Sequence, residues 1–135
     1  MTPHLAEKTP VLEYVELNEG YYAAYEAYTP DLGTITRIAI ARPTAHVVIP
    51  SRMSCSDCIR NVPRMARIAN YLPGWTWEVY DHDSHPVRNI ELGIASVPTF
   101  IVYDFEGGNE LGRIVENPVS GWLEADLLQL VTRFR

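Results

Sequence analysis

The sequence predicts an α/β fold, in which a central mixed sheet is flanked by helices. Short apolar runs that are typical of buried strands begin at Val47, Trp75 and Thr99. Apolar residues at helical spacing lie between the first two runs and again near the end of the chain. Strands that alternate with helices in this way are typical of a sheet packed between helices. The chain has 135 residues, which is long enough for one domain with its own core.

The charge and the apolar runs of the chain argue against two classes of partner. The net charge is −6, from 11 Lys and Arg against 17 Asp and Glu, whereas a nucleic-acid partner requires a basic face. No apolar run approaches the roughly 18 residues of a membrane span, and the N-terminus lacks the basic-then-apolar pattern of a secretory signal. We therefore expect a cytoplasmic protein, in which a cysteine pair is more often catalytic or metal-binding than structural.

Residues 1–45 are predicted to form a helical N-terminal extension, with a loose terminus at residues 1–8. One or two amphipathic helices are expected over residues 11–28, with an interruption at residues 18–20. Apolar and aromatic side chains recur there at helical spacing, namely Leu12, Val15, Tyr22, Tyr25 and Tyr28. We expect these tyrosines to pack in the core rather than to form a binding surface.

A further helix is predicted before the first strand. Thr29 is expected to be its N-cap, with Pro30 in the first turn. Helical spacing continues from there as far as Pro43. Residues 34–41 are also rich in β-branched side chains, as strands are, and we prefer the helix.

A strand, a cysteine pair and a helix follow one another at the centre of the sequence. The apolar run at residues 47–49 is followed by Cys55 and Cys58, the only two cysteines of the chain. The next stretch has an apolar face at helical spacing, formed by Ile59, Val62, Met65, Ala66 and Ala69. Its other face, which we expect to be solvated, carries Arg60, Arg64 and Arg67.

The C-terminal half predicts two more strands, a hairpin and a helix. In chain order, these are a strand at residues 75–80, a polar loop at 81–86, a short helix at 87–92, a strand at 99–103, a hairpin turn at 106–109 and a returning strand at 110–115. Ser120 is expected to cap the last helix. The buried side of that helix is expected to carry Trp122, Leu123, Leu127, Leu128, Leu130 and Val131.

The layout of the cysteine pair suits redox chemistry. Ser54 as N-cap and Asp57 three residues later are expected to form a capping pair. Cys55 then lies in the first helical turn, where unsatisfied N–H groups and the helix dipole favour a thiolate. Cys55 is therefore the expected attacking sulfur, and Cys58, one turn deeper, resolves the mixed disulfide. Asp57 is expected to disfavour the thiolate, since a nearby negative charge raises a thiol pKa. Alternatively, Asp57 only caps the helix.

Four markers in register resemble the thioredoxin family, from about residue 46 to the C-terminus. The cysteine pair follows the first core strand, and Pro63 is similar to the proline that kinks the active-site helix of thioredoxins. Residues 83–86 lie where the family has its loop after the next parallel strand. Residues 93–100 resemble the segment that holds the family's cis-proline, which implies that Pro98 is that residue. The resemblance implies a thioredoxin fold over residues 46–135.

The same resemblance implies an activity. It assigns a dithiol–disulfide cycle to Cys55 and Cys58, with Pro98 facing the substrate. Because Pro98 has no N–H, the backbone of Val97 is free to pair with an extended substrate. The C-x-D-C pattern is similar to that of relatives that favour small or particular disulfides. We expect a thiol–disulfide oxidoreductase, specifically a reductase, that acts on a disulfide-containing protein or small molecule, uses an unidentified electron donor and needs no cofactor.

The sequence also departs from the thioredoxin pattern. Ser54 stands where thioredoxins have a tryptophan, and Ser51 where another aromatic is expected. Ile49 replaces the buried aspartate that assists proton transfer to the resolving cysteine. Residues 1–45 do not match thioredoxin itself and look like the helical extension of certain bacterial thioredoxin-like proteins. These departures argue against broad protein-disulfide reductase activity and against coupling to thioredoxin reductase.

Two other functions are consistent with the same residues. Cys55 and Cys58 could combine with His82 and His85 into a zinc site with two sulfur and two imidazole ligands. Alternatively, the histidines are polar residues near the rim of a redox site. The second of these functions is that of a binding module that kept the thioredoxin fold without redox turnover.

Overall fold

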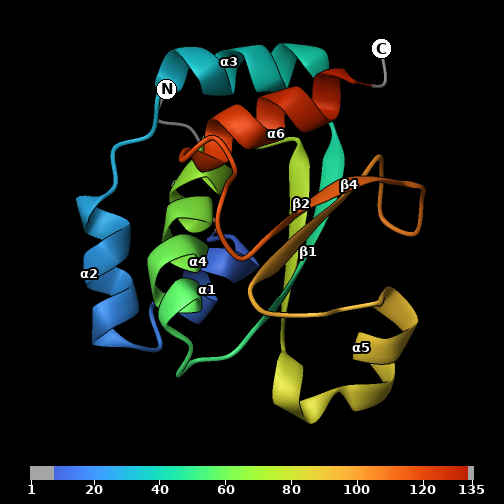
Figure 1. The fold of residues 1–135 in the computed structure, drawn as a ribbon. Helices are drawn as coiled ribbons and strands as arrows, with labels where there is room; N and C mark the ends of the chain where they lie inside the picture. Colours follow the sequence, from blue (N-terminus) through green and yellow to red (C-terminus); the bar gives the residue numbers. More distant parts are fainter. Residues whose placement is uncertain (1–7, 134–135) are drawn as a thin grey trace.

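A four-stranded mixed sheet lies at the centre of the protein (Figure 1). Its strands are β1 (Ala45–Ser51), β2 (Trp75–Asp81), β3 (Thr99–Tyr103) and β4 (Glu110–Val115), in the spatial order β2–β1–β3–β4. β1 pairs with β2 in parallel, whereas β1 with β3 and β3 with β4 are antiparallel. The computed structural model describes residues 8–133. The loose terminus predicted for residues 1–8 therefore lies, except for its last residue, outside the described residues.

Strand β1 is the most deeply buried strand. All seven of its residues are buried, because β2 covers one of its edges and β3 the other. Val47 lies opposite Trp77 on one side and Val102 on the other, and all three belong to the hydrophobic core. An apolar run without polar alternation is typical of a strand covered on both faces.

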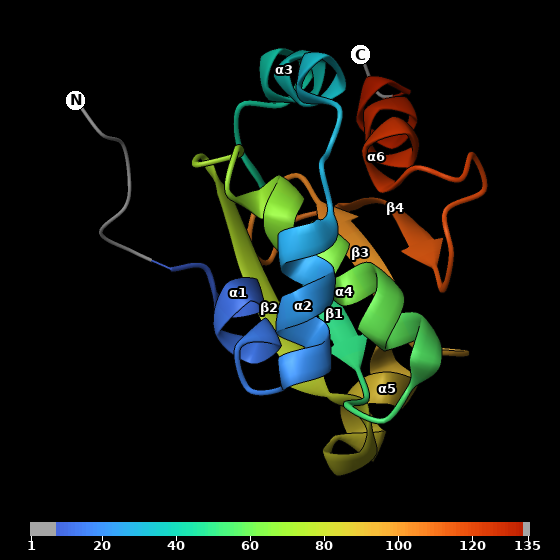
Figure 2. The same cartoon turned by 90° about the vertical axis from the view of Figure 1, so that its left-hand side faces the viewer.

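The helices pack on the sheet and on one another. They are α1 (Pro10–Val15), α2 (Glu19–Ala27), α3 (Leu32–Ala41), α4 (Ser56–Ala69), α5 (Pro86–Leu92) and α6 (Leu123–Thr132), with a short 3-10 turn η1 (His82–Ser84) before α5. α1 packs against β2 and α4, α2 lies on α4, and α3 lies on α6 (Figure 2). Within residues 8–133, no helix combines the length and the apolar character needed to cross a bilayer.

Two helices fill the first part of the N-terminal segment, and the interruption between them lies at residues 16–18 rather than at the expected residues 18–20. α1 ends at Val15. Asn18 then caps α2, because its side-chain oxygen accepts hydrogen bonds from the N–H groups of Gly20 (2.8 Å) and Tyr21 (3.2 Å). The segment rich in β-branched residues is helical, as we expected, and forms most of α3.

The prediction of Thr29 as the N-cap of the third helix is wrong. Asp31 holds this position, and α3 begins one residue later. The backbones of Tyr28 and Asp31 are extended instead, because Glu124 of α6 binds this segment. The Glu124 carboxylate accepts hydrogen bonds from the Tyr28 hydroxyl (2.5 Å) and from the Asp31 N–H (2.7 Å).

Two predictions for the last helix are also wrong. Ser120 does not cap it, since α6 begins at Leu123 with Trp122 in the N-cap position. The loop before α6 is held instead by the Asp126 carboxylate, which accepts hydrogen bonds from the N–H groups of Val119 (2.7 Å) and Ser120 (3.0 Å). Trp122 is 55% exposed rather than buried, because it precedes the helix and lies outside its apolar face.

Helix α2 covers a face of α4 that we predicted to be solvated. The Arg64 guanidinium lies 5.1 Å from the centre of the Tyr28 ring, and that of Arg67 lies 4.8 Å from the Tyr25 ring. Arg67 Nε also donates a hydrogen bond to the Tyr28 carbonyl (3.1 Å). The prediction of a fully solvated arginine face is therefore wrong for these two side chains. Each cation–π contact of this kind stabilises by about 0.5–1 kcal/mol at partly exposed sites.

The buried faces of α2 and α4 differ from the predicted ones at single positions. Tyr21 is fully buried, whereas Tyr22, which we expected in the core, is 37% exposed. Ile59, which we expected on the buried face of α4, is 36% exposed. Tyr25 and Tyr28 are buried as expected.

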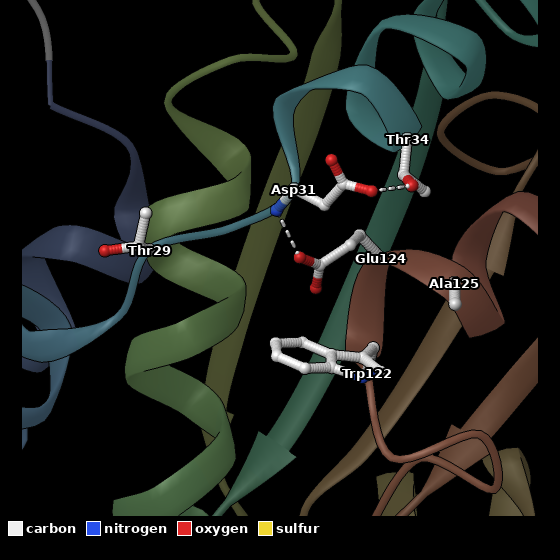
Figure 3. A pocket seen from close by; sticks show the side chains of 6 residues that line it. All are labelled: Thr29, Asp31, Thr34, Trp122, Glu124 and Ala125. Carbon is white, nitrogen blue, oxygen red and sulfur yellow. Dashed lines mark hydrogen bonds between the residues drawn. The ribbon is translucent and has the colours of Figure 1, made fainter.

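A pocket of about 280 Å³ lies where α3 and α6 begin (Figure 3). Its lining residues are Thr29, Asp31, Thr34, Trp122, Glu124 and Ala125. Glu124 is only 1% exposed, and both of its oxygens already have protein donors. α3 and α6 lie at the end of the sheet opposite the first turn of α4 (Figure 1). The buried carboxylate therefore links the N-terminal helices to α6 and is structural.

We expect Glu124→Ala to lower the free energy of unfolding by about 3–5 kcal/mol. The change leaves the Tyr28 hydroxyl and the Asp31 N–H without their charged acceptor. Urea unfolding followed by circular dichroism measures the loss. Glu106→Ala, at an exposed turn residue, is the matched control, with an expected change within about 0.5 kcal/mol. Equal losses in the two variants contradict a linking role for Glu124.

Candidate active site

The two cysteines lie where β1 ends and α4 begins. β1 ends at Ser51, and α4 starts at Ser56 with Cys55 in the N-cap position. Cys55 Sγ accepts a hydrogen bond from the N–H of Cys58 (3.2 Å). The prediction that Ser54 caps this helix is therefore wrong, because the sulfur one residue later takes the N-cap role. Ser54 itself is exposed.

The two thiols have different environments. Both are free, but Cys55 is half-buried whereas Cys58 is fully buried. Burial raises the pKa of the Cys58 thiol to about 12, and its hydrogen bond with Cys55 acts in the same direction. Hydrogen bonds from the Ser51 hydroxyl and from the Arg52 N–H (3.5 Å) act in the opposite direction. Cys55 is therefore the thiol that a reagent in solvent can reach.

The segment before β3 closes the site on the other side of Cys55. The Val97–Pro98 peptide bond is cis, as we expected. The Cys55 thiol donates a hydrogen bond to the Val97 carbonyl (3.6 Å). Val97 is 7% exposed, so its backbone contacts the cysteine while its side chain packs in the core. The structure thus brings Cys55, Val97 and Pro98 together.

Asp57 lies in the first turn of α4 and has a partner of opposite charge. Its carboxylate lies 2.9 Å from the Arg60 guanidinium, which also donates a hydrogen bond to Asn117 (3.1 Å). Asp57 is not the partner of a Ser54 cap. The positive charge of Arg60 offsets the repulsion that we expected Asp57 to exert on the thiolates.

Arg52, Asp83 and His82 form a separate polar cluster beside the site, and His85 has other partners. Arg52 Nε donates to both oxygens of Asp83 (3.0 Å each), and a second Arg52 nitrogen lies 3.3 Å from His82 Nδ1. The bond with Asp83 raises the pKa of Arg52, and the same bond lowers the pKa of the Asp83 carboxyl. His85 Nδ1 donates to the Asp81 carbonyl (2.9 Å).

This cluster does not support the zinc alternative. In the described part of the chain, no group of three or more His, Cys, Asp or Glu side chains is arranged to hold a metal ion. His82 faces Arg52 and Asp83, and the His85 ring is held by the Asp81 carbonyl at the end of β2. The histidines are therefore not combined with the cysteines into a ligand set.

Two site residues that the sequence does not predict come from the N-terminal helices. The Tyr14 hydroxyl donates to Ser51 Oγ (3.1 Å). The Tyr21 hydroxyl donates to the carbonyls of Arg52 (3.0 Å) and Met53 (2.9 Å). The two rings pack edge to face, with centres 5.7 Å apart. The only signal in the sequence is the presence of tyrosines in an amphipathic helix, which a core role explains equally well.

Comparison with known proteins assigns the family. A family model described as Thioredoxin matches residues 8–125. This chain belongs to the thioredoxin family. The match includes α1, α2 and α3 as well as the cysteine pair and Pro98. The thioredoxin fold and the two close cysteines support a redox function of the thioredoxin type.

Solved structures share the thioredoxin fold at low sequence identity. A protein of unknown function from Pseudomonas aeruginosa has a TM-score of 0.77 and 15% identity, covering 95% of this chain and 94% of that one. Thioredoxin from Fasciola hepatica has a TM-score of 0.54 and 21% identity, covering 74% and 89%. The NTD_N/C domain of the alkylhydroperoxide reductase AhpF from Enterococcus faecalis has a TM-score of 0.59 and 19% identity, covering 83% and 52%. A comparison with curated proteins gave no match.

We expect iodoacetamide to alkylate Cys55 but not Cys58 in the native, reduced protein near neutral pH. Cys58 is fully buried, and its raised pKa leaves almost no thiolate there. Mass spectrometry of the intact chain should show one adduct, which peptide mapping assigns to Cys55. The same protein in urea is the control and should take two adducts. A native adduct at Cys58 contradicts this assignment of the accessible thiol.

Proposed function

We propose that this thioredoxin-family protein is a thiol–disulfide oxidoreductase that reduces disulfides through a Cys55–Cys58 dithiol–disulfide cycle. One observation carries the proposal. The half-buried Cys55 sulfur caps α4, with the Cys58 N–H on one side and the Val97 carbonyl, next to cis Pro98, on the other. In this position it is open to a substrate sulfur and one helical turn from a second thiol.

The cycle has two displacement steps. The Cys55 thiolate attacks one sulfur of the substrate disulfide, which forms a mixed disulfide and releases the first substrate thiolate. The Cys58 thiolate then attacks Cys55 Sγ, which forms the Cys55–Cys58 disulfide and releases the second substrate thiolate. The two released thiolates take up two protons, equal to those lost by the cysteines. The substrate is reduced by two electrons and the protein is oxidised by two.

The residues around Cys55 have distinct roles in this proposal. The N–H groups of the first turn of α4 and the helix dipole stabilise the Cys55 thiolate. Pro98 offers no N–H, so the backbone of Val97 is the group that pairs with an extended substrate. Asp57 and the exposed Ser54 lie on the substrate side, and with Arg60 they set which disulfides approach.

The substrate of this proposal is a disulfide-containing protein or small molecule, and a separate donor re-reduces the pair. The exposed Ser54 leaves the rim without the broad apolar ring of a tryptophan. The flanking charges come from two ion pairs, Asp57 with Arg60 and Asp83 with Arg52. These features favour a particular substrate rather than general protein disulfides. A cytoplasmic setting agrees with a reductase, since thiols are kept reduced there.

The reduction potential of the Cys55–Cys58 pair tests the proposal. We expect a reversible two-electron couple near the thioredoxin value of about −270 mV, measured by equilibration in dithiothreitol buffers with thiol trapping and mass readout. A potential near about −120 mV would instead make the protein an oxidant. A pair with no reversible couple contradicts the cycle. If that sample retains zinc, the result would support the metal alternative. If it holds no zinc, the result would support the binding-module alternative.

Two substitutions separate the roles of the cysteines. We expect Cys55→Ser to abolish disulfide reduction, because the reachable nucleophile is lost. Cys58→Ser should instead keep the first step and accumulate a stable mixed disulfide with the substrate, because the resolving thiol is absent. Intact-mass analysis after incubation with hydroxyethyl disulfide distinguishes the two outcomes. Mixed disulfide in Cys55→Ser but not in Cys58→Ser reverses the assignment.

A further inference from the structure

The N-terminal helices reach the buried cysteine through a chain of two hydroxyl groups. Tyr14 of α1 donates to Ser51 Oγ (3.1 Å), and the next residue, Arg52, donates its N–H to Cys58 Sγ (3.5 Å). Hydrogen bonding from the Ser51 side chain acts to lower the pKa of the Cys58 thiol. Ser51 is fully buried at the end of β1. Nothing in the proposed cycle so far uses either hydroxyl.

The resolving step needs help at this position. Cys58 attacks as a thiolate, yet it is fully buried and its pKa lies near 12. Ile49, which is fully buried, stands where thioredoxins carry an aspartate, so this position supplies no carboxylate. The hydrogen bonds that favour the charged sulfur come from the Ser51 hydroxyl and the Arg52 N–H.

We propose that Ser51 and Tyr14 are positioning residues for the resolving step, and that their hydroxyls together stabilise the Cys58 thiolate by hydrogen-bond donation. The proposal rests on the proposed function, because it concerns the second step of that cycle. Tyr14 fills the acceptor side of Ser51, so that the single Ser51 proton is directed at the sulfur. The N-terminal helices thereby become part of the redox centre.

The hydroxyls act as donors and do not take the proton. Burial raises the pKa of Tyr14 above its ordinary value, so its hydroxyl stays protonated. The proton that Cys58 loses goes to solvent, and the substrate thiolate released in the same step takes one up. The Cys58 Sγ–Cys55 Sγ bond forms as the bond between Cys55 Sγ and the substrate sulfur breaks, so the step balances.

Other groups near Cys58 act on the same equilibrium. Cys55 hydrogen-bonds to Cys58, and Tyr21 holds the loop that carries the Arg52 N–H. The charged groups beside this network are the Arg52 guanidinium and Asp81. Tyr14 also hydrogen-bonds with Tyr21, so Tyr14→Phe removes that contact as well, whereas Ser51→Ala leaves Tyr21 untouched and isolates the hydroxyl chain.

Stopped-flow reaction of the reduced protein with 5,5′-dithiobis(2-nitrobenzoate) separates the two steps. Attack by Cys55 releases one thionitrobenzoate, and resolution by Cys58 releases a second. Loss of the Ser51 hydrogen bond should raise the pKa of Cys58 by about one to two units. A higher pKa lowers the thiolate fraction and so the rate. A more basic thiolate is also a stronger nucleophile, which offsets about half of this loss on a logarithmic scale. We therefore expect Ser51→Ala to slow the second phase about three- to tenfold.

The pH profile and a double variant distinguish positioning from general damage. In Ser51→Ala, the pH at which the second phase reaches a given rate should rise by about half to one unit. The rate of the first phase should be unchanged. Tyr14→Phe should slow the second phase about twofold, in keeping with the modest cooperative strengthening along hydrogen-bond chains. It should add nothing in the Ser51→Ala background, since it acts through Ser51. Tyr22→Phe removes a hydroxyl from a 37% exposed tyrosine of the same N-terminal helices and should leave both phases as in the wild type.

Failure of the inference differs from failure of the proposed function. Two phases in all proteins, with the same second-phase rate and pH profile in wild type, Tyr14→Phe and Ser51→Ala, keep the redox cycle and overturn the positioning role. Slower first and second phases together in these variants also overturn it, because they indicate a damaged site. A wild-type protein that releases one thionitrobenzoate and shows no reversible couple overturns the cycle and the inference together.

Discussion

The burial of Cys58 is the constraint on which the rest of the site depends. The thiol lies behind the end of β1, where the chain leaves an entirely buried strand and turns into α4. A sulfur at that depth is protected from solvent reagents, but its charged form loses hydration. Neighbouring hydrogen-bond donors compensate for this lost hydration. They come from the end of β1, from the loop after it and, through Ser51, from the N-terminal helices.

The sequence predicts the sheet and the redox layout of the cysteine pair because each depends on a local pattern, whereas the cis-proline follows from the resemblance to thioredoxins. The unbroken apolar run at residues 47–49 and the alternation at residues 75–80 correspond to β1 and β2. The helix cap was less predictable. Ser54 and Cys55 are adjacent, and a hydroxyl is ordinarily the better acceptor, so the one-residue shift to the sulfur is not visible in the spacing.

The contacts of the N-terminal helices could not be predicted, since they join distant parts of the chain. Tyr14 and Ser51 are 37 residues apart, and Tyr21 and Arg52 are 31 apart. A helical period shows that a tyrosine has a buried side but not what it meets there. For the same reason, Arg64 and Arg67 resemble a solvated face until α2 is seen to cover them. The N-terminal helices therefore complete a site whose cysteines they do not contain.

The link at Glu124 has a consequence for the order in which the protein matures during synthesis. The carboxylate is 96 residues from Tyr28 and 93 from Asp31 along the chain. The N-terminal helices leave the ribosome first, and the strand and helix that hold the cysteines follow. The acceptor that fixes residues 28–31 emerges only with α6. The cysteine centre is thus translated in full before residues 28–31, at the other end of the sheet, are anchored, and the last helix completes the attachment of the first three.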